Sequence, residues 1–183
     1  GRLFFWDQRI TQLADGRIVA LFWTYDREKK QEVPIHAGWS EDGGQTWRQP
    51  KSTGIEGQVA SPIPLADGRL AMTWVRRHAP PSIRLAISKD GNSWGEEFTV
   101  YDHRAQNIAG GDGKTKTGDY LQTMQLWNFG LPGGVQLPNG NLLISQGWPH
   151  DINKYRAPLG LAAVAKKREY HLCSSKIKRH CRP

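Results

Sequence analysis

The chain has 183 residues, of which 38% are hydrophobic and 10% aromatic, enough for one ordinary globular core and too apolar for a disordered chain. Its formal net charge of +8 would favour nucleic acid or an acidic membrane as a partner if the charge covered the whole surface. Residues 166–183, however, hold seven Lys or Arg against one acidic residue, which leaves the other 165 residues with 18 basic and 16 acidic groups. The body is therefore nearly neutral, and neither nucleic acid nor a membrane is expected as its partner.

The first predicted unit covers residues 3–56 and contains four short strands. Apolar runs on either side of Asp15-Gly16 predict a β-hairpin, because Asp-Gly between such runs is a strong hairpin signal. A third strand leads to the turn Ser-Glu-Asp-Gly-Gly-Gln-Thr-Trp at residues 40–47, and a fourth strand is expected after it.

The second unit, residues 57–102, repeats the first. Leu65-Ala-Asp-Gly-Arg restates Leu13-Ala-Asp-Gly-Arg, and residues 88–94 restate the later turn in a form one residue shorter. The hairpin turns lie 52 residues apart and the later turns 48, a period typical of four-stranded propeller blades.

A third unit, residues 128–165, begins with a hairpin around Asn139-Gly140 and follows a Gly-rich, polar insertion at 102–127. Residues 1–165 are thus predicted to form an all-β partial propeller of about three blades. Its open blade edges predict self-association.

The later turns resemble the Asp box, Ser-x-Asp-x-Gly-x-Thr-Trp, of bacterial neuraminidase (sialidase) repeats. Local physics gives this motif a structural role: Asp42 and Asp90 can accept backbone N–H bonds across the turn, while Trp47 and Trp94 can fill the gap between strands. The segment from Trp6 to Arg17 also resembles the Arg-Ile-Pro strand near the start of many sialidases, with Thr11 in place of proline. Over residues 3–150 the resemblance implies a six-bladed sialidase-like propeller.

Antiparallel connectivity sorts the loops. The hairpins and Asp boxes are predicted to share one rim of the propeller, and the other rim receives the starts of the innermost strands and the loops after the second strands. Polar and aromatic residues at that second rim are candidates for binding the substrate: Trp6, Arg9, Gln58, Arg76, Arg77, His78 and His150.

The resemblance implies chemistry for some of these residues. In sialidases an arginine cluster holds the substrate carboxylate, a tyrosine is the nucleophile and an aspartate is the acid/base. Arg9 matches the arginine of the Arg-Ile-Pro strand. Asp26 and Asp7 lie at the correct rim for an acid/base, although neither matches a motif, and Phe129 stands where a tyrosine is common.

The basic tail, residues 166–183, is predicted to be disordered. It holds four potential zinc ligands, His171, Cys173, His180 and Cys181, but their spacing is not that of a usual zinc site, so no metal or cofactor is expected.

Three functions are compatible with these patterns. The first is a sialidase-like glycoside hydrolase acting on a glycan, with acidic sugars included. The second is a propeller that binds glycan or protein without cleavage, and the third is a fragment without independent activity. The sequence does not identify the sugar or the compartment.

Overall fold

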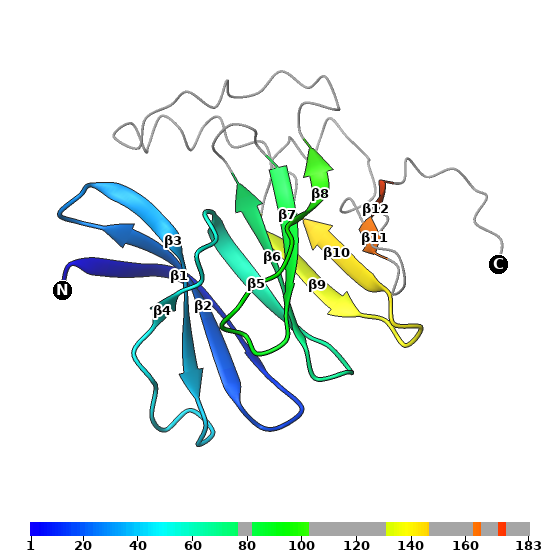
Figure 1. The fold of residues 1–183 in the computed structure, drawn as a ribbon, viewed down its shortest axis with the longest axis horizontal. Coiled ribbons are helices and arrows are strands. Elements are labelled where there is room, and N and C mark those ends of the chain that lie inside the picture. The colour runs from blue at the N-terminus through cyan, green and yellow to red at the C-terminus, as the bar shows by residue number, and fades with distance from the viewer. Residues whose placement is uncertain (77–81, 103–130, 147–162, 166–171, 175–183) are drawn as a thin grey trace, which may run out of the picture.

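A computed structural model describes residues 1–76, 82–102, 131–146, 163–165 and 172–174. Every regular element in this part of the chain is a β-strand, which confirms the all-β prediction. The strands form three four-stranded antiparallel sheets, each with the order of a simple meander (Figure 1). No helix suited to crossing a membrane is found among the described residues.

The sheets follow one another along the chain. The first contains β1 (Leu3–Gln12), β2 (Ile18–Asp26), β3 (Gln31–Ser40) and β4 (Lys51–Ser52). The second contains β5 (Gln58–Pro64), β6 (Leu70–Arg76), β7 (Ser82–Ser88) and β8 (Phe98–Asp102). The third contains β9 (Pro132–Gln136), β10 (Leu142–Gln146), β11 (Ala163–Ala165) and β12 (Leu172–Ser174). β12 lies within the predicted tail, most of which is outside the described residues, so the proposed domain limits stay a prediction.

Each sheet begins with the predicted hairpin. In the first, Gly16 adopts a positive φ of 88° and the Asp15 carboxylate accepts a hydrogen bond from the Arg17 N–H at 3.1 Å. The turns at Asp67-Gly68 and Asn139-Gly140 repeat both features. Only glycine adopts such a φ without strain, which explains why each turn contains one.

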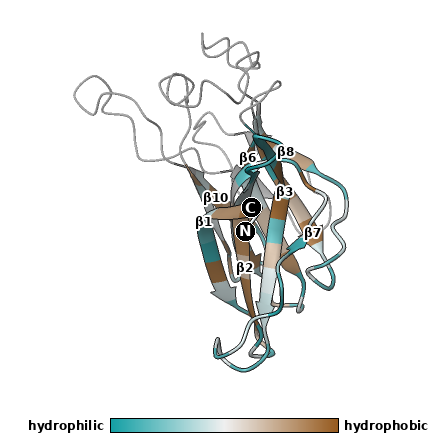
Figure 2. Cartoon of the chain, turned by 90° about the vertical axis from the view of Figure 1, so that its left-hand side faces the viewer, coloured by the Kyte–Doolittle hydropathy of each residue, from teal (hydrophilic) through white to brown (hydrophobic). Residues whose placement is uncertain are grey.

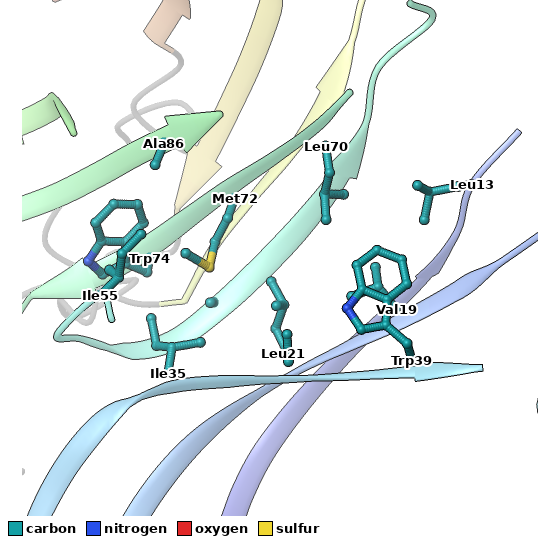
Figure 3. Packing of buried hydrophobic residues seen from close by; sticks show 12 residues of the cluster. Leu13, Val19, Leu21, Ile35, Trp39, Ile55, Leu70, Met72, Trp74 and Ala86 are labelled. Atoms are coloured by element: carbon teal, nitrogen blue, oxygen red, sulfur yellow. The ribbon is translucent and has the colours of Figure 1, made fainter. Parts of the chain in front are cut away.

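The sheets pack face to face in sequence, as consecutive propeller blades do. Alternation along a strand sends neighbouring side chains to different interfaces, and hydrophobic and hydrophilic residues are interleaved along β1 and β3 (Figure 2). In β6, Met72 and Trp74 pack against the first sheet, whereas Ala71 and Val75 pack toward the third. Figure 3 shows the first of these two cores. The six-bladed count stays a prediction.

We call the two turns that resemble the Asp box, residues 40–47 and 88–94, the Asp-box turns, and in each of them hydrogen bonds to the aspartate close the turn. The hydroxyl and backbone N–H of Thr46 and the hydroxyl of Ser40 donate to the Asp42 carboxylate, and they hold its pKa at about 2. The N–H groups of Ser93 and Asn92 do the same for the pKa of Asp90, again about 2. Both aspartates thus have a structural role within their turns.

The tryptophans of the two turns differ. Trp94 is half-buried and packs against the core between the first and second sheets. Trp47 is 42% exposed, and its indole N–H donates to the Gly44 carbonyl at 3.1 Å. The expected filling role therefore describes Trp94 better than Trp47.

Candidate functional site

The hairpins and the Asp-box turns lie along one edge of the molecule, the lower edge in Figure 1. The start of β1, the turn from β2 to β3 and the start of β5 lie at the other ends of the same strands, and we call this edge the upper rim. The upper rim is the one at which the sequence places the candidate site.

Aromatic side chains dominate the upper rim of the first sheet. Trp6 stacks on Tyr25, with ring centroids 4.9 Å apart and planes at 16°, and Phe4 stacks beside Trp6 at 6.4 Å. Trp23 meets Trp6 edge to face at 5.2 Å and is buried beneath it. We call Phe4, Trp6 and Tyr25 the aromatic shelf.

The aromatic shelf is built by cross-strand pairing. Phe4 lies directly opposite Tyr25, and Trp6 lies opposite Trp23, so alternation along two strands gathers four rings on one side of the sheet. Phe4 is 40% exposed, which leaves part of its ring open to solvent. The guanidinium carbon of Arg27 lies 4.6 Å from the centre of that ring, in a cation–π arrangement.

Asp7 and Arg9 stand beside the aromatic shelf on β1. The pairing of β1 with β2 skips Asp7, which marks a β-bulge that turns its side chain out of the regular alternation. The Asp7 carboxylate accepts a hydrogen bond from Arg9 Nη1 at 2.7 Å, and the same nitrogen donates to the Gln8 carbonyl at 3.0 Å. Both side chains are half-exposed, and within the described part of the chain the contacts of Arg9 use Nη1, which leaves Nε and Nη2 for an anion.

Asp26, the other candidate acid/base, has a different environment. It is buried, and its Oδ2 accepts hydrogen bonds from Arg2 at 2.6 and 2.8 Å. Its Oδ1 accepts the N–H groups of Glu28 and Lys29, which closes the turn between β2 and β3. The Arg2 bonds, followed by that of the Lys29 N–H, lower the pKa of Asp26 to about 2. Such a carboxylate is suited to fixing a turn rather than to donating a proton near neutral pH.

Gln58 connects the first two sheets at the upper rim. It is buried at the start of β5, and its side-chain amide donates to the Glu32 carboxylate of β3 at 2.6 Å. Glu32 lies directly opposite Tyr25 in the β2–β3 pairing. This bond fixes the position of the second sheet relative to the shelf.

The remaining candidates do not join this cluster in the described part of the chain. Arg76 ends β6 and is half-buried. Arg77, His78, His150 and Phe129 lie outside the described residues. Sequence reasoning missed Phe4 and Glu32, although the alternation of Phe4 with Trp6 in a predicted strand was a usable signal for the first.

A separate polar hollow lies on the lower rim, between the Asp-box turns. It is lined by Arg17, Trp39, Glu41, Arg48, Lys51 and Asn92. Arg17 covers the Trp39 ring at 5.1 Å and pairs with Asp15, and Arg48 pairs with Glu41. Two of its three cations are thus already paired with carboxylates. Among the described residues no His, Cys, Asp or Glu group is arranged to hold a metal ion.

Comparison with known proteins identifies no family: no family model fits the chain, and no curated protein matches it. A protein of unknown function from Dyadobacter fermentans has a similar structure, with a TM-score of 0.57 and 20% identity over 90% of this chain and 37% of that one. This chain therefore spans little more than a third of that protein, and the likeness shows the fold alone.

Two glycan-acting enzymes are more distant. The intramolecular trans-sialidase of Ruminococcus gnavus has a TM-score of 0.39 and 16% identity over 76% of this chain and 38% of that one. Levansucrase of Bacillus subtilis has a TM-score of 0.47 and 15% identity over 82% of this chain and 43% of that one. Both TM-scores are too low to support an argument about function.

Proposed function

We propose that this chain belongs to a sialidase-like propeller that binds carboxylate-bearing glycans on the aromatic shelf. The observation that carries the proposal is the stack of Phe4, Trp6 and Tyr25 with Arg27 and Arg9 at its margins. Flat aromatic faces bury the apolar side of a sugar ring, and a guanidinium recognises a carboxylate with two parallel hydrogen bonds.

The charges around the shelf favour binding over cleavage. A glycosidase needs a carboxyl group able to donate a proton and a second group that attacks or activates water. On the described upper rim, Asp26 is fixed by Arg2 and the Glu32 carboxylate accepts the Gln58 amide. Asp7 stands half-exposed beside the shelf, and it shares a hydrogen bond with Arg9.

Hydrolysis is the second candidate function, and the bulge at Asp7 is the observation that favours it. This bulge re-aims a carboxylate from the innermost strand next to a free edge of Arg9. A substrate carboxylate that pairs with Arg9 would compete with Asp7 and leave the Asp7 side chain able to act on the sugar. Release of fluorophore from a fluorogenic sialoside, lost in Asp7→Asn, would establish this activity.

The binding proposal is tested by titrating the protein with sialyllactose and with lactose, which lacks the carboxylate. We expect sialyllactose to bind more tightly, and Phe4→Ala to weaken its binding by about 0.5–1.5 kcal/mol, roughly a two- to tenfold loss. Isothermal titration calorimetry measures both differences.

Phe5→Ala is the matched control. Phe5 is the next residue of the same strand and is exposed to a similar degree, 37%, but it points to the other side of the sheet and contacts Phe22. Equal losses in the two variants, or equal affinity for lactose and sialyllactose, would rule out the shelf as the acidic-sugar site.

A further inference from the structure

One side of the first sheet is apolar and only partly covered by described segments, because Ala20 is buried whereas Ile18 and Phe22 are half-buried. Val19 and Leu21 of β2 pack against the second sheet, so alternation turns Ile18, Ala20 and Phe22 the other way. We call this side the outer face. On the outer face, the rings of Phe5 and Phe22 lie with their centroids 5.2 Å apart. Ile10, which pairs with Ala20, is 59% exposed there.

The repeat shows what such a face does elsewhere in the molecule. The hairpins align by their closing bond, from the N–H of Leu13, Leu65 or Leu137 to the carbonyl four residues later. Counting from that bond, the outer-face residues of β2 correspond to the residues of β6 that pack against the first sheet: Leu70, Met72 and Trp74. Each of these three is at most 1% exposed. The outer face therefore has the pattern of a sheet-to-sheet interface.

The Asp-box turns show the same difference. Gly91, in the second sheet, lies against Trp39 of the first, where an added Cβ would come within 2.1 Å of the indole. Gly43 is its equivalent in the first sheet, with a similar φ of 72° but nothing within 4 Å of an added Cβ. Trp47 is likewise exposed where Trp94 is packed. Two equivalent positions thus meet a neighbouring sheet in the second repeat and meet no described one in the first.

The sheet that fits the outer face is identified by the contacts within the chain. Between the second and third sheets, Ile63 of β5 meets Gly134 of β9, where an added Cβ would lie 2.5 Å from Ile63 Cδ1. When the hairpins are aligned by their closing bonds, Ile63 of the second sheet corresponds to Val135 of the third. In the same alignment, Gly134 of the third sheet corresponds to Ile10 of the first. Val135 is 53% exposed. Val135 and Ile10 are therefore the two unmatched halves of one repeating contact.

We propose that a second copy of this chain places its third sheet on the outer face, so that Val135 of one copy meets Ile10 of the other. The contact is head-to-tail, because it joins two different faces. Two such contacts close a ring of two chains if the geometry returns to its start, and otherwise the contact continues into a longer assembly. Covering the outer face removes exposed Ile and Phe from water, which drives the association.

The test uses the whole chain and its mass in solution, measured by light scattering over a range of concentrations. We expect wild type to reach at least twice the 20.6 kDa of one chain. Ile10→Asp and Val135→Asp should each return it to one chain, because each buries a charge at the junction. Both positions are exposed within the single chain, so neither change disturbs its core, and circular dichroism verifies the fold.

Mixing the variants distinguishes head-to-tail contact from other pairings. The Ile10→Asp chain keeps its third sheet and the Val135→Asp chain keeps its first, so an equimolar mixture should regain a two-chain species through one unchanged junction. Phe4→Asp changes an apolar residue that is 40% exposed on the other side of β1, and it should leave the mass of wild type unchanged. A single-chain mass for wild type at every concentration would overturn the proposal. Loss of association in Ile10→Asp but not in Val135→Asp would also overturn it, since that pattern indicates pairing of two outer faces.

Discussion

The carboxylate of Asp26 lies within the candidate site but is engaged by the fold. Arg2 and two backbone N–H groups hold it, and its pKa of about 2 keeps it ionised except in strong acid. General acids work best with a pKa near the operating pH. The catalytic role foreseen for Asp26 stays a prediction, and its surroundings make Asp7 the better candidate.

Acid should destabilise the fold through Asp26, Asp42 and Asp90. The pKa of each is lowered to about 2 in the folded state, against about 3.9 in an unfolded chain. The stability that this shift provides is complete above about pH 4 and is lost as the pH falls through about 2. We expect the urea midpoint to drop in this window, and to drop less steeply in Asp26→Asn, which is less stable at pH 7 but has one carboxylate fewer to protonate. An equally steep profile for Asp26→Asn would contradict this assignment.

Site residues could be predicted from the sequence where a motif or an alternating strand pattern indicates them. The sequence indicates Arg9 because it matches the arginine of a known motif, and it indicates Trp6 and Asp7 because they lie beside Arg9 at the start of the same strand. The bond from Gln58 to Glu32 joins residues 26 apart in different sheets, and no local pattern indicates that pairing. The engagement of Asp26 by Arg2 was hidden for the same reason, since the two residues are 24 apart.

The Asp-box turn of the second sheet acts between elements as well as within its own. Gly91 combines a positive φ of 75° with direct contact to the Trp39 ring of the first sheet. A glycine is required there twice over, by the backbone conformation and by the space. The turn therefore sets how closely two sheets approach.

Replacing Gly43 or Gly91 by alanine, one at a time, separates the requirement of the backbone from the requirement for space. Gly43→Ala introduces only the left-handed strain, about 1–2 kcal/mol, because its surroundings are open. Gly91→Ala adds a collision with Trp39, and such overpacking lowers the free energy of unfolding by roughly a further 1–3 kcal/mol. Chemical denaturation should rank the variants in that order, and equal losses would show that Trp39 moves aside freely.

Strands next to clear turn residues could be predicted from the sequence, and strands without turn residues or an alternating pattern could not. Asp-Gly and Asn-Gly turns between apolar runs indicate the hairpins that open all three sheets. β11 consists of Ala163, Val164 and Ala165, which carry no alternation from which to derive a register. β12 lies in a basic segment without apolar periodicity, and its pairing with β11 is decided by the tertiary fold.

At the scale of the whole molecule, Ile10 on the first sheet and Val135 on the third are both exposed among the described residues, at opposite ends of one stack of sheets. A protein that associates through such faces gains stability by mass action, because the bound state removes folded chains from the unfolding equilibrium. The melting temperature of wild type should therefore rise with protein concentration, and that of Ile10→Asp should not. Scanning calorimetry at several concentrations measures the difference, and parallel behaviour of the two proteins would contradict association through the outer face.

The proposed glycan site and the proposed association surface lie on different sides of β1, so each can be tested without the other. Phe4 and Trp6 belong to the aromatic shelf, whereas Phe5 and Ile10 belong to the outer face. A chain that assembles yet binds no sugar would disprove the proposed function alone.

The most direct test of the proposed function is a crystal structure of the chain soaked with sialyllactose. We predict the sugar ring over Trp6 and Phe4, with its carboxylate on Arg27 or on the free edge of Arg9. Sugar density in the lower-rim hollow between Arg17 and Lys51, with the shelf bare, would contradict the account.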